Sequence, residues 1–235
     1  MQPEWRGNSL YRSEFVKIMS NQETPNRCRV VLIAPPAGPE LEARLQSALS
    51  AGDVASLIVP QYDADDVSFQ AHAERLTQIA QAANVATVIA GEPRIAARVH
   101  ADGMHLEGNA DDLAEAISKY QSKMMVGCGG IKTRDEAMVL GETEPDYLFF
   151  GKFGFDNKPE PHPRNLSLGQ WWSEMMQIPC IVLAGDDVAS VVDVANTGAD
   201  FVALGAAVFA EGKDPAKMVA EANALLDASA PRFED

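Results

Sequence analysis

Cysteine is scarce in this sequence. Only 3 of the 235 residues are cysteines, Cys28, Cys128 and Cys180, and their spacing matches no metal-binding pattern. Two of them fall inside segments that are expected to be strands, and no signal peptide precedes them. We therefore expect three reduced thiols in or near a core, in a cytoplasmic protein.

Basic residues and long apolar runs are also lacking. The chain has 19 Lys and Arg residues against 34 Asp and Glu residues, a formal net charge of -15. Such a surface repels nucleic-acid phosphates and anionic lipid, which excludes non-specific nucleic-acid binding. The longest apolar runs fall well short of the roughly 18 residues of a membrane span, so we expect a soluble protein without a membrane partner. A phosphorylated ligand would need a local site of backbone N–H groups and one or two basic side chains.

The sequence does contain a repeated pattern from residue 29 onward, in which a short apolar run is followed by a turn and an amphipathic helix. The pattern predicts eight strands, at residues 29–35, 54–60, 85–91, 102–108, 123–130, 146–154, 179–185 and 200–209. It predicts helices at residues 39–52, 69–84, 111–122, 133–144, 167–177, 187–199 and 215–229.

Apolar strands that alternate with helices are typical of a parallel sheet covered by helices on its outside. Eight such units favour a closed (β/α)8 TIM barrel, and an open doubly wound sheet of six or seven strands is the alternative. We expect the barrel to span residues 28–230, between an N-terminal extension at 1–27 and a C-terminal tail at 231–235. The sequence leaves open whether the extension is disordered or forms a short helix, and whether identical copies assemble into a homo-oligomer.

Several expected strands end in glycine or proline. In a barrel these ends form the ligand-binding face, where glycine lets the backbone approach a ligand, although glycine can also serve only the turn. The seventh and eighth ends occupy the place where barrels often bind phosphate. Gly185, Gly205 and Ala206 are small enough for backbone binding there, whereas Asp186 and Asp187 suit a helix cap.

The loop after the sixth strand, at residues 151–167, is long and holds Lys152, Lys158, His162 and Arg164. Four potentially cationic groups in one loop of an acidic chain fit a lid over an anionic ligand. The alternative is a polar surface loop without a binding role.

Other conspicuous side chains are expected to be structural. His105 lies in the middle of the fourth strand, where a barrel-interior histidine is favoured over a catalytic base. Trp171 and Trp172 lie in an expected helix beside Met175 and Met176, and we expect them to pack in the outer ring of helices.

Several segments carry a family resemblance. Residues 101–108 read A-D-G-M-H-L-E-G and residues 145–153 read P-D-Y-L-F-F-G-K-F. They resemble A-D-G-V-H-L-G-Q and G-A-D-Y-V-G-F-G-P-I-F of thiamine phosphate synthase and its relative, the thiazole tautomerase. Residues 178–186 and 198–208 are similar to the family's I-P-V-V-A-I-G-G-I and G-A-D-G-V-A-V-V-S-A-I. The resemblance runs in order over about residues 29–229.

The resemblance implies a (β/α)8 barrel that joins a hydroxymethylpyrimidine diphosphate to a thiazole phosphate in thiamine biosynthesis, with Mg²⁺ on the diphosphate. The displacement would pass through a pyrimidine cation, so the protein neutralises the leaving diphosphate and positions the thiazole nitrogen. By this resemblance the catalytic cations are Lys158 and Lys152, the metal ligands are Glu92 and Asp111, and the phosphate-binding residues are Gly185, Gly205, Ala206, Gly129 and Gly130.

The metal ligands depend on how the chain is aligned with the family. Counted without a gap, the family's N-D-R falls on residues 90–92, A-G-E, and its second metal aspartate falls on Ala110. A slip of one residue at both places restores Glu92 and Asp111 as a carboxylate pair.

Other active-site positions depart from the family pattern. Residues 57–63 read L-I-V-P-Q-Y-D where the family has the cationic Q-L-R-E-K. Residues 127–130 lack the hydroxyls of the family's G-V-S-T, and the tautomerase histidine corresponds to Ile131. The lid motif P-T-x-T-K corresponds to residues 154–158, in which Lys158 keeps the lysine.

Two functions from different classes follow. The first is a transferase of the thiamine phosphate synthase type with a divergent active site. The second is a catalytically impaired paralogue that binds a small phosphorylated ligand without transferring it. A tautomerase is disfavoured because Ile131 replaces its histidine.

Overall fold

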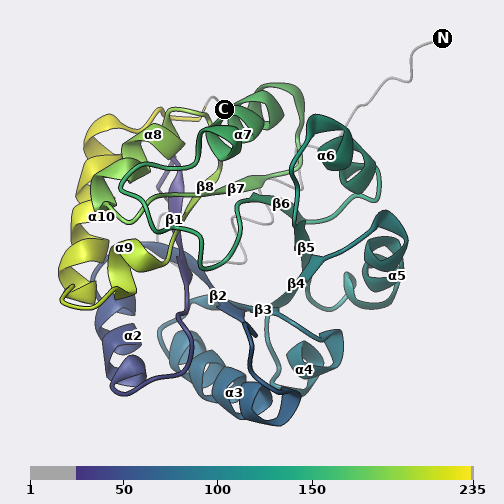
Figure 1. The fold of residues 1–235 in the computed structure, drawn as a ribbon, viewed down its shortest axis with the longest axis horizontal. Coiled ribbons are helices and arrows are strands. Elements are labelled where there is room, and N and C mark those ends of the chain that lie inside the picture. The colour runs from purple at the N-terminus through teal and green to yellow at the C-terminus, as the bar shows by residue number, and fades with distance from the viewer. Residues whose placement is uncertain (1–24, 234–235) are drawn as a thin grey trace.

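The computed structural model describes residues 25–233, which form a closed barrel of parallel strands in the order β1 to β8. The strands make an inner ring and the helices surround it, so that the chain passes once around the barrel (Figure 1). The expected (β/α)8 barrel is confirmed, and the alternative of an open sheet is excluded.

The strands are β1 (Arg29–Ile33), β2 (Val54–Pro60), β3 (Ala86–Ala90), β4 (Gly103–Glu107), β5 (Met125–Gly129), β6 (Tyr147–Phe150), β7 (Cys180–Leu183) and β8 (Phe201–Leu204). The helices are α2 (Leu41–Leu49), α3 (Asp66–Ala82), α4 (Pro93–Arg98), α5 (Ala110–Tyr120), α6 (Arg134–Gly141), α7 (Pro163–Met175), α8 (Val191–Ala195), α9 (Ala206–Phe209) and α10 (Pro215–Ser229), with a 3-10 turn η1 at Val188–Ser190.

The sequence pattern located every strand but misjudged some of the elements around them. Residues 206–209, expected as the end of the last strand, form α9, since a short buried apolar run looks the same in either state. Helix α4 was not predicted because its six residues are too few to show a helical period. The helix expected at residues 187–199 is divided into η1 and α8.

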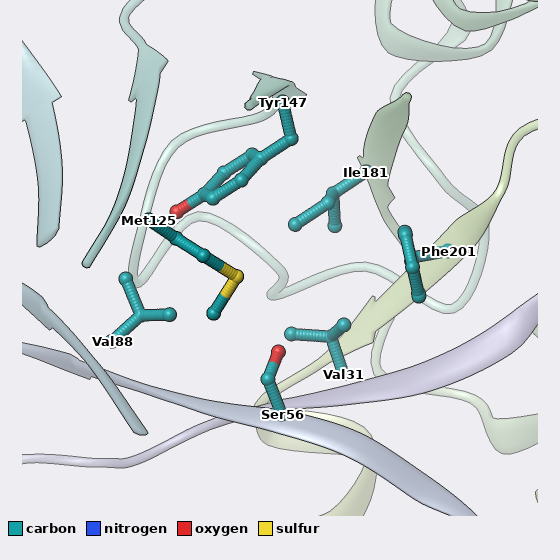
Figure 2. A pocket seen from close by; sticks show the side chains of 7 residues that line it. All are labelled: Val31, Ser56, Val88, Met125, Tyr147, Ile181 and Phe201. Atoms are coloured by element: carbon teal, nitrogen blue, oxygen red, sulfur yellow. The ribbon is translucent and has the colours of Figure 1, made fainter. Parts of the chain in front are cut away.

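The interior of the barrel is packed with side chains. Toward the N-terminal ends of the strands, seven side chains from seven strands converge (Figure 2): Val31, Ser56, Val88, Met125, Tyr147, Ile181 and Phe201. They leave a void of about 10 Å³, which is room for about one water molecule. This part of the barrel is therefore a core and not a ligand cavity.

The strands are buried on their outer faces as well, under the ring of helices. Trp172 of α7 is buried there, and its Nε1–H donates a hydrogen bond to the carbonyl of Ile178 at 2.7 Å. The outer-ring packing predicted for this tryptophan is confirmed. The three cysteines are buried and form no disulfide, as expected for reduced core thiols.

Side-chain caps set where several helices begin. The carboxylate of Asp65 accepts hydrogen bonds from the N–H groups of Val67 and Ser68 at the start of α3. Thr133 and Glu136 form a reciprocal capping box at the start of α6. Asp187 caps η1 through the N–H of Ala189, the role expected for it.

The two ends of the described residues, near Arg27 and Arg232, meet beside α10. Arg27, which the sequence analysis assigned to the extension, is 1% exposed, and its guanidinium donates to Asp227 and Asn223. Arg27 also forms an antiparallel bridge with Arg232 of the expected tail. Residues 1–24 of the expected extension lie outside the described residues. Within residues 25–233, no helix combines the length and apolar character that crossing a bilayer requires.

Candidate functional site at the carboxyl ends of the strands

The predicted phosphate site lies where β7 and β8 end. Gly185 follows β7 and is buried, and Gly205 precedes α9 directly after β8. The N–H of Gly185 donates to the Ser190 hydroxyl at 3.0 Å, and the N–H of Ala206 donates to the Asp156 carboxylate. Two backbone donors of the expected site thus have partners from the chain itself, and one of these partners is an anionic oxygen.

The loop between β6 and α7 lies against both strand ends. A Cβ atom at Gly185 would come within 2.1 Å of the Pro159 carbonyl oxygen, and one at Gly205 within 2.6 Å of the Asp156 carboxylate. The N–H of Asp186 also donates to the carbonyl of Lys158 at 2.7 Å. Because neither glycine has a Cβ atom, another group can come close to its backbone, and in this structure residues 156–159 of the loop occupy that space.

The other predicted phosphate-binding residues, Gly129 and Gly130, lie at the end of β5. A Cβ atom at Gly129 would come within 2.8 Å of the Nε2 atom of His105, so this glycine makes room for the histidine ring. Gly130 has a φ of +79° and is exposed, with Glu107 as its nearest side chain. These glycines serve packing and a turn, and their part in phosphate binding stays a prediction.

The predicted catalytic lysines are both exposed in the β6–α7 loop. The ammonium group of Lys152 lies 4.1 Å from the centre of the Phe155 ring, a cation–π contact. The ammonium group of Lys158 has no hydrogen-bond or ion-pair partner among the described residues. His162 and Arg164 belong to the start of α7, where the His162 ring accepts a hydrogen bond from the Arg164 N–H.

The predicted metal ligands follow β3 and β4. Glu92 precedes α4 and Asp111 lies in the first turn of α5, and both carboxylates are exposed. Neither makes a hydrogen bond or ion pair with the described residues, and within residues 25–233 no group of three or more His, Cys, Asp or Glu forms a metal cluster. Mg²⁺ is often held by one or two carboxylates together with substrate phosphates. The metal-binding role of Glu92 and Asp111 therefore stays a prediction.

An aromatic cluster fills the barrel below the mouth. The ring of His105 stacks on Tyr147 and meets the edges of Phe149 and Phe153, with centroids 5.1 to 5.8 Å apart. Burial lowers the pKa of His105 to about 3, so the imidazole is neutral. His105 is an interior histidine, as predicted.

Three mouth residues escaped the sequence analysis. The Asp156 carboxylate accepts a hydrogen bond from the N–H of Ala206. The hydroxyl of Tyr62, in the loop after β2, donates to the carbonyl of Ala34 at 3.0 Å. The ammonium of Lys213 donates to the carbonyl of Asp186. Burial and the nearby Asp156 charge raise the pKa of Tyr62 to about 12. These residues come from loops far apart in sequence. Asp156 and Tyr62 lie in segments 154–158 and 57–63, which depart from the family's motifs, so neither side chain was assigned a role from the sequence.

Comparison with known proteins places this chain in a family. The thiamine monophosphate synthase family model matches residues 30–208. The chain is 35% identical to a thiamine-phosphate synthase of Rhodospirillum centenum, over 85% of this chain and 98% of the relative. It is 32% identical to a thiamine-phosphate synthase of Hyphomonas neptunium, over 87% of this chain and 96% of the relative.

The fold has a counterpart among solved structures as well. Thiamine phosphate pyrophosphorylase from Pyrococcus furiosus superposes with a TM-score of 0.72 at 18% identity, over 86% of this chain and 97% of that chain. The barrel and the sequence similarity both extend over nearly the whole of the relatives. The chain belongs to the thiamine monophosphate synthase family.

Proposed function

We propose that this protein is a cytoplasmic transferase that joins a hydroxymethylpyrimidine diphosphate to a thiazole phosphate. The observation that carries the proposal is the similarity to thiamine-phosphate synthases over nearly their full length. The position of the β6–α7 loop supports it, because this loop brings the exposed Lys158 to the end of β7. Two small phosphorylated substrates are the partners in this reaction.

The protein's part in the reaction is mainly to neutralise charge and to position groups. The exposed ammonium of Lys158 is free to meet the leaving diphosphate, whereas the Lys152 ammonium must first leave the ring of Phe155. Lys158 is therefore the first choice for the cation that stabilises developing negative charge on the diphosphate.

Glu92 and Asp111 would hold Mg²⁺ together with diphosphate oxygens. When bound there, the ion would add positive charge against the leaving group. In this proposal the two exposed carboxylates bind the ion and take no part in proton transfer.

The phosphate of the thiazole would bind to backbone N–H groups at Gly185, Gly205 and Ala206. The contact with Asp156 supports this, because the Ala206 N–H already donates a hydrogen bond to an anionic oxygen there. Gly129 and Gly130 lie at the end of β5, which β6 separates from β7, and there they would bind the diphosphate.

The alternative is a paralogue that binds a phosphorylated ligand without transferring it. The end of β2 favours it: the Gln61 amide donates to Ala64 of its own loop and to Asp66 at the start of α3, and Tyr62 donates to the carbonyl of Ala34. Neither side chain supplies a cation where the family has Arg and Lys.

The deciding experiment incubates the purified protein with both substrates and Mg²⁺ and measures thiamine phosphate. We expect product from the wild type and a large loss in Glu92→Ala and Asp111→Ala, with Glu115→Ala on the exposed side of α5 as the matched control. Ligand binding without product would reject the transferase in favour of the paralogue. Product formation that survives both substitutions would reject this metal pair.

A further inference from the structure

The β6–α7 loop is anchored in the barrel mouth at three successive places. The ring of Phe153 packs on Phe149 and His105, with centroids 4.9 and 5.1 Å apart. The carboxylate of Asp156 accepts a hydrogen bond from Ala206, and the carbonyl of Lys158 accepts one from Asp186. Residues 153–158 thus cross from the aromatic interior to the ends of β8 and β7.

Asp156 is an unusual anchor because it is an acid without a cation. Asp156 is only 8% exposed. Among residues 25–233, the Ala206 N–H is the only group that donates a hydrogen bond to its carboxylate. No Lys, Arg or His of these residues forms an ion pair with it. A buried carboxylate is costly unless its oxygens are bound, so this backbone donor decides where Asp156 lies.

The same N–H is the donor that the proposed function assigns to the substrate phosphate. One N–H of this kind cannot serve a carboxylate and a phosphate at once, and two anions side by side would repel each other. The carbonyls of Lys158 and Pro159 also cover Gly185, which leaves no room for a phosphate there while the loop is in place.

We propose that Asp156 is an internal competitor for the phosphate site, so that the β6–α7 loop closes the empty site and a phosphate must displace it. This inference rests on the phosphate site of the proposed function. It makes Asp156 a residue that sets affinity: the apparent affinity for phosphate equals the intrinsic affinity reduced by the fraction of molecules with the loop displaced.

The first test measures binding of inorganic phosphate by calorimetry to the full-length protein. In Asp156→Ala the competitor is gone, and we expect phosphate to bind about tenfold more tightly or better, the size of effect typical for one charge-assisted hydrogen bond. Glu160→Ala is the matched control: it removes the same charge from the same loop, but Glu160 is exposed and touches neither glycine. Its affinity should stay at the wild-type value.

The second test asks whether the carboxylate seats the loop, without any ligand. Trypsin should cleave after Lys152 faster in Asp156→Ala than in the wild type or in Glu160→Ala, because the freed loop is more accessible. Cleavage at the wild-type rate would contradict the proposal. Circular dichroism of each variant verifies that the barrel is folded.

Phosphate binding that is equal in Asp156→Ala and Glu160→Ala, or undetectable in both, would overturn the inference. The outcome is separable from that of the proposed function. A protein that makes thiamine phosphate while Asp156→Ala gains no affinity keeps the function and loses the competitor. A gain of affinity without any product keeps the competitor and rejects the transferase.

Discussion

The Nδ1 atom of His105 lies 3.0 Å from the hydroxyl oxygen of Tyr147 inside the barrel, and the two groups share a buried hydrogen bond. The Nε2 atom of the same ring has no partner among the described residues. Protonation of this ring would place an uncompensated charge in the core. The pair therefore holds a neutral imidazole and makes folding sensitive to acid.

His105 should make the protein less stable as the pH falls. Its pKa is about 3 in the folded protein, far below the ordinary value of about 6.5, because burial disfavours the charged ring. Between these values the unfolded chain binds a proton that the folded one does not, so stability is complete above about pH 6.5 and declines below it. The decline from this one group amounts to about 1.4 kcal/mol per pH unit.

Urea unfolding between pH 4.5 and 7 measures this effect. His105→Leu should flatten the dependence of unfolding free energy on pH, whatever its stability at neutral pH. His100→Asn changes an exposed histidine and should keep the wild-type slope. Equal slopes in all three proteins would show that His105 is not the acid-sensitive group.

The ion pair of Arg29 with Asp53 should matter more than a surface pair. Arg29 is 3% exposed, and two of its nitrogens donate to the Asp53 carboxylate at 2.6 and 2.9 Å. Asp53→Ala leaves a buried guanidinium without its partner and should cost about 3 kcal/mol of unfolding free energy.

The surface pair of Arg75 with Glu42 is the control, since both side chains are more than half exposed. Glu42→Ala should cost less than about 1 kcal/mol. Denaturant unfolding of both variants tests the contrast. If the two losses are similar, burial does not govern the Arg29 pair.

Gly127 should resist even one added methyl group. A Cβ atom there would lie 2.1 Å from the Tyr147 ring, which is itself enclosed by the barrel. Gly127→Ala should therefore lower the unfolding free energy by about 2 kcal/mol through overpacking. A Cβ atom at Gly38 would lie 3.9 Å from its nearest neighbour, so Gly38→Ala should change the unfolding free energy by less than about 0.5 kcal/mol. Thermal unfolding measures the stability of both variants. If Gly127→Ala is as stable as the wild type, the core around Tyr147 is packed less tightly than the structure indicates.

Lys158 and Lys152 should contribute unequally to transfer. The Lys158 ammonium is free among the described residues, whereas that of Lys152 rests on the Phe155 ring. Lys158→Gln should lower kcat/KM by about tenfold or more, and Lys152→Gln by less. Lys217→Gln, at an exposed position of α10, is the control and should match the wild type. Steady-state kinetics with both substrates test the order, and a larger loss at Lys152 would reverse the assignment.

Local pattern carried much of the fold. The eight apolar runs were recognisable because parallel strands are buried on both faces, and the ends of α10 were predicted at the observed residues. Short elements were harder: α4 has too few residues for a period, and α9 is as apolar as a strand. Their state depends on what packs against them.

For the candidate site too, some features followed from the sequence and others only from the tertiary structure. The sequence by itself determined the barrel, the family and the positions of the strand ends, because these follow from periodicity and from motifs within single segments. Only the tertiary structure decided which groups meet in the mouth. Asp156 reaches Ala206 across 50 positions, and Tyr62 bonds to Ala34 across 28. Such pairings depend on loop paths over a closed barrel, and no local preference of either residue encodes its distant partner.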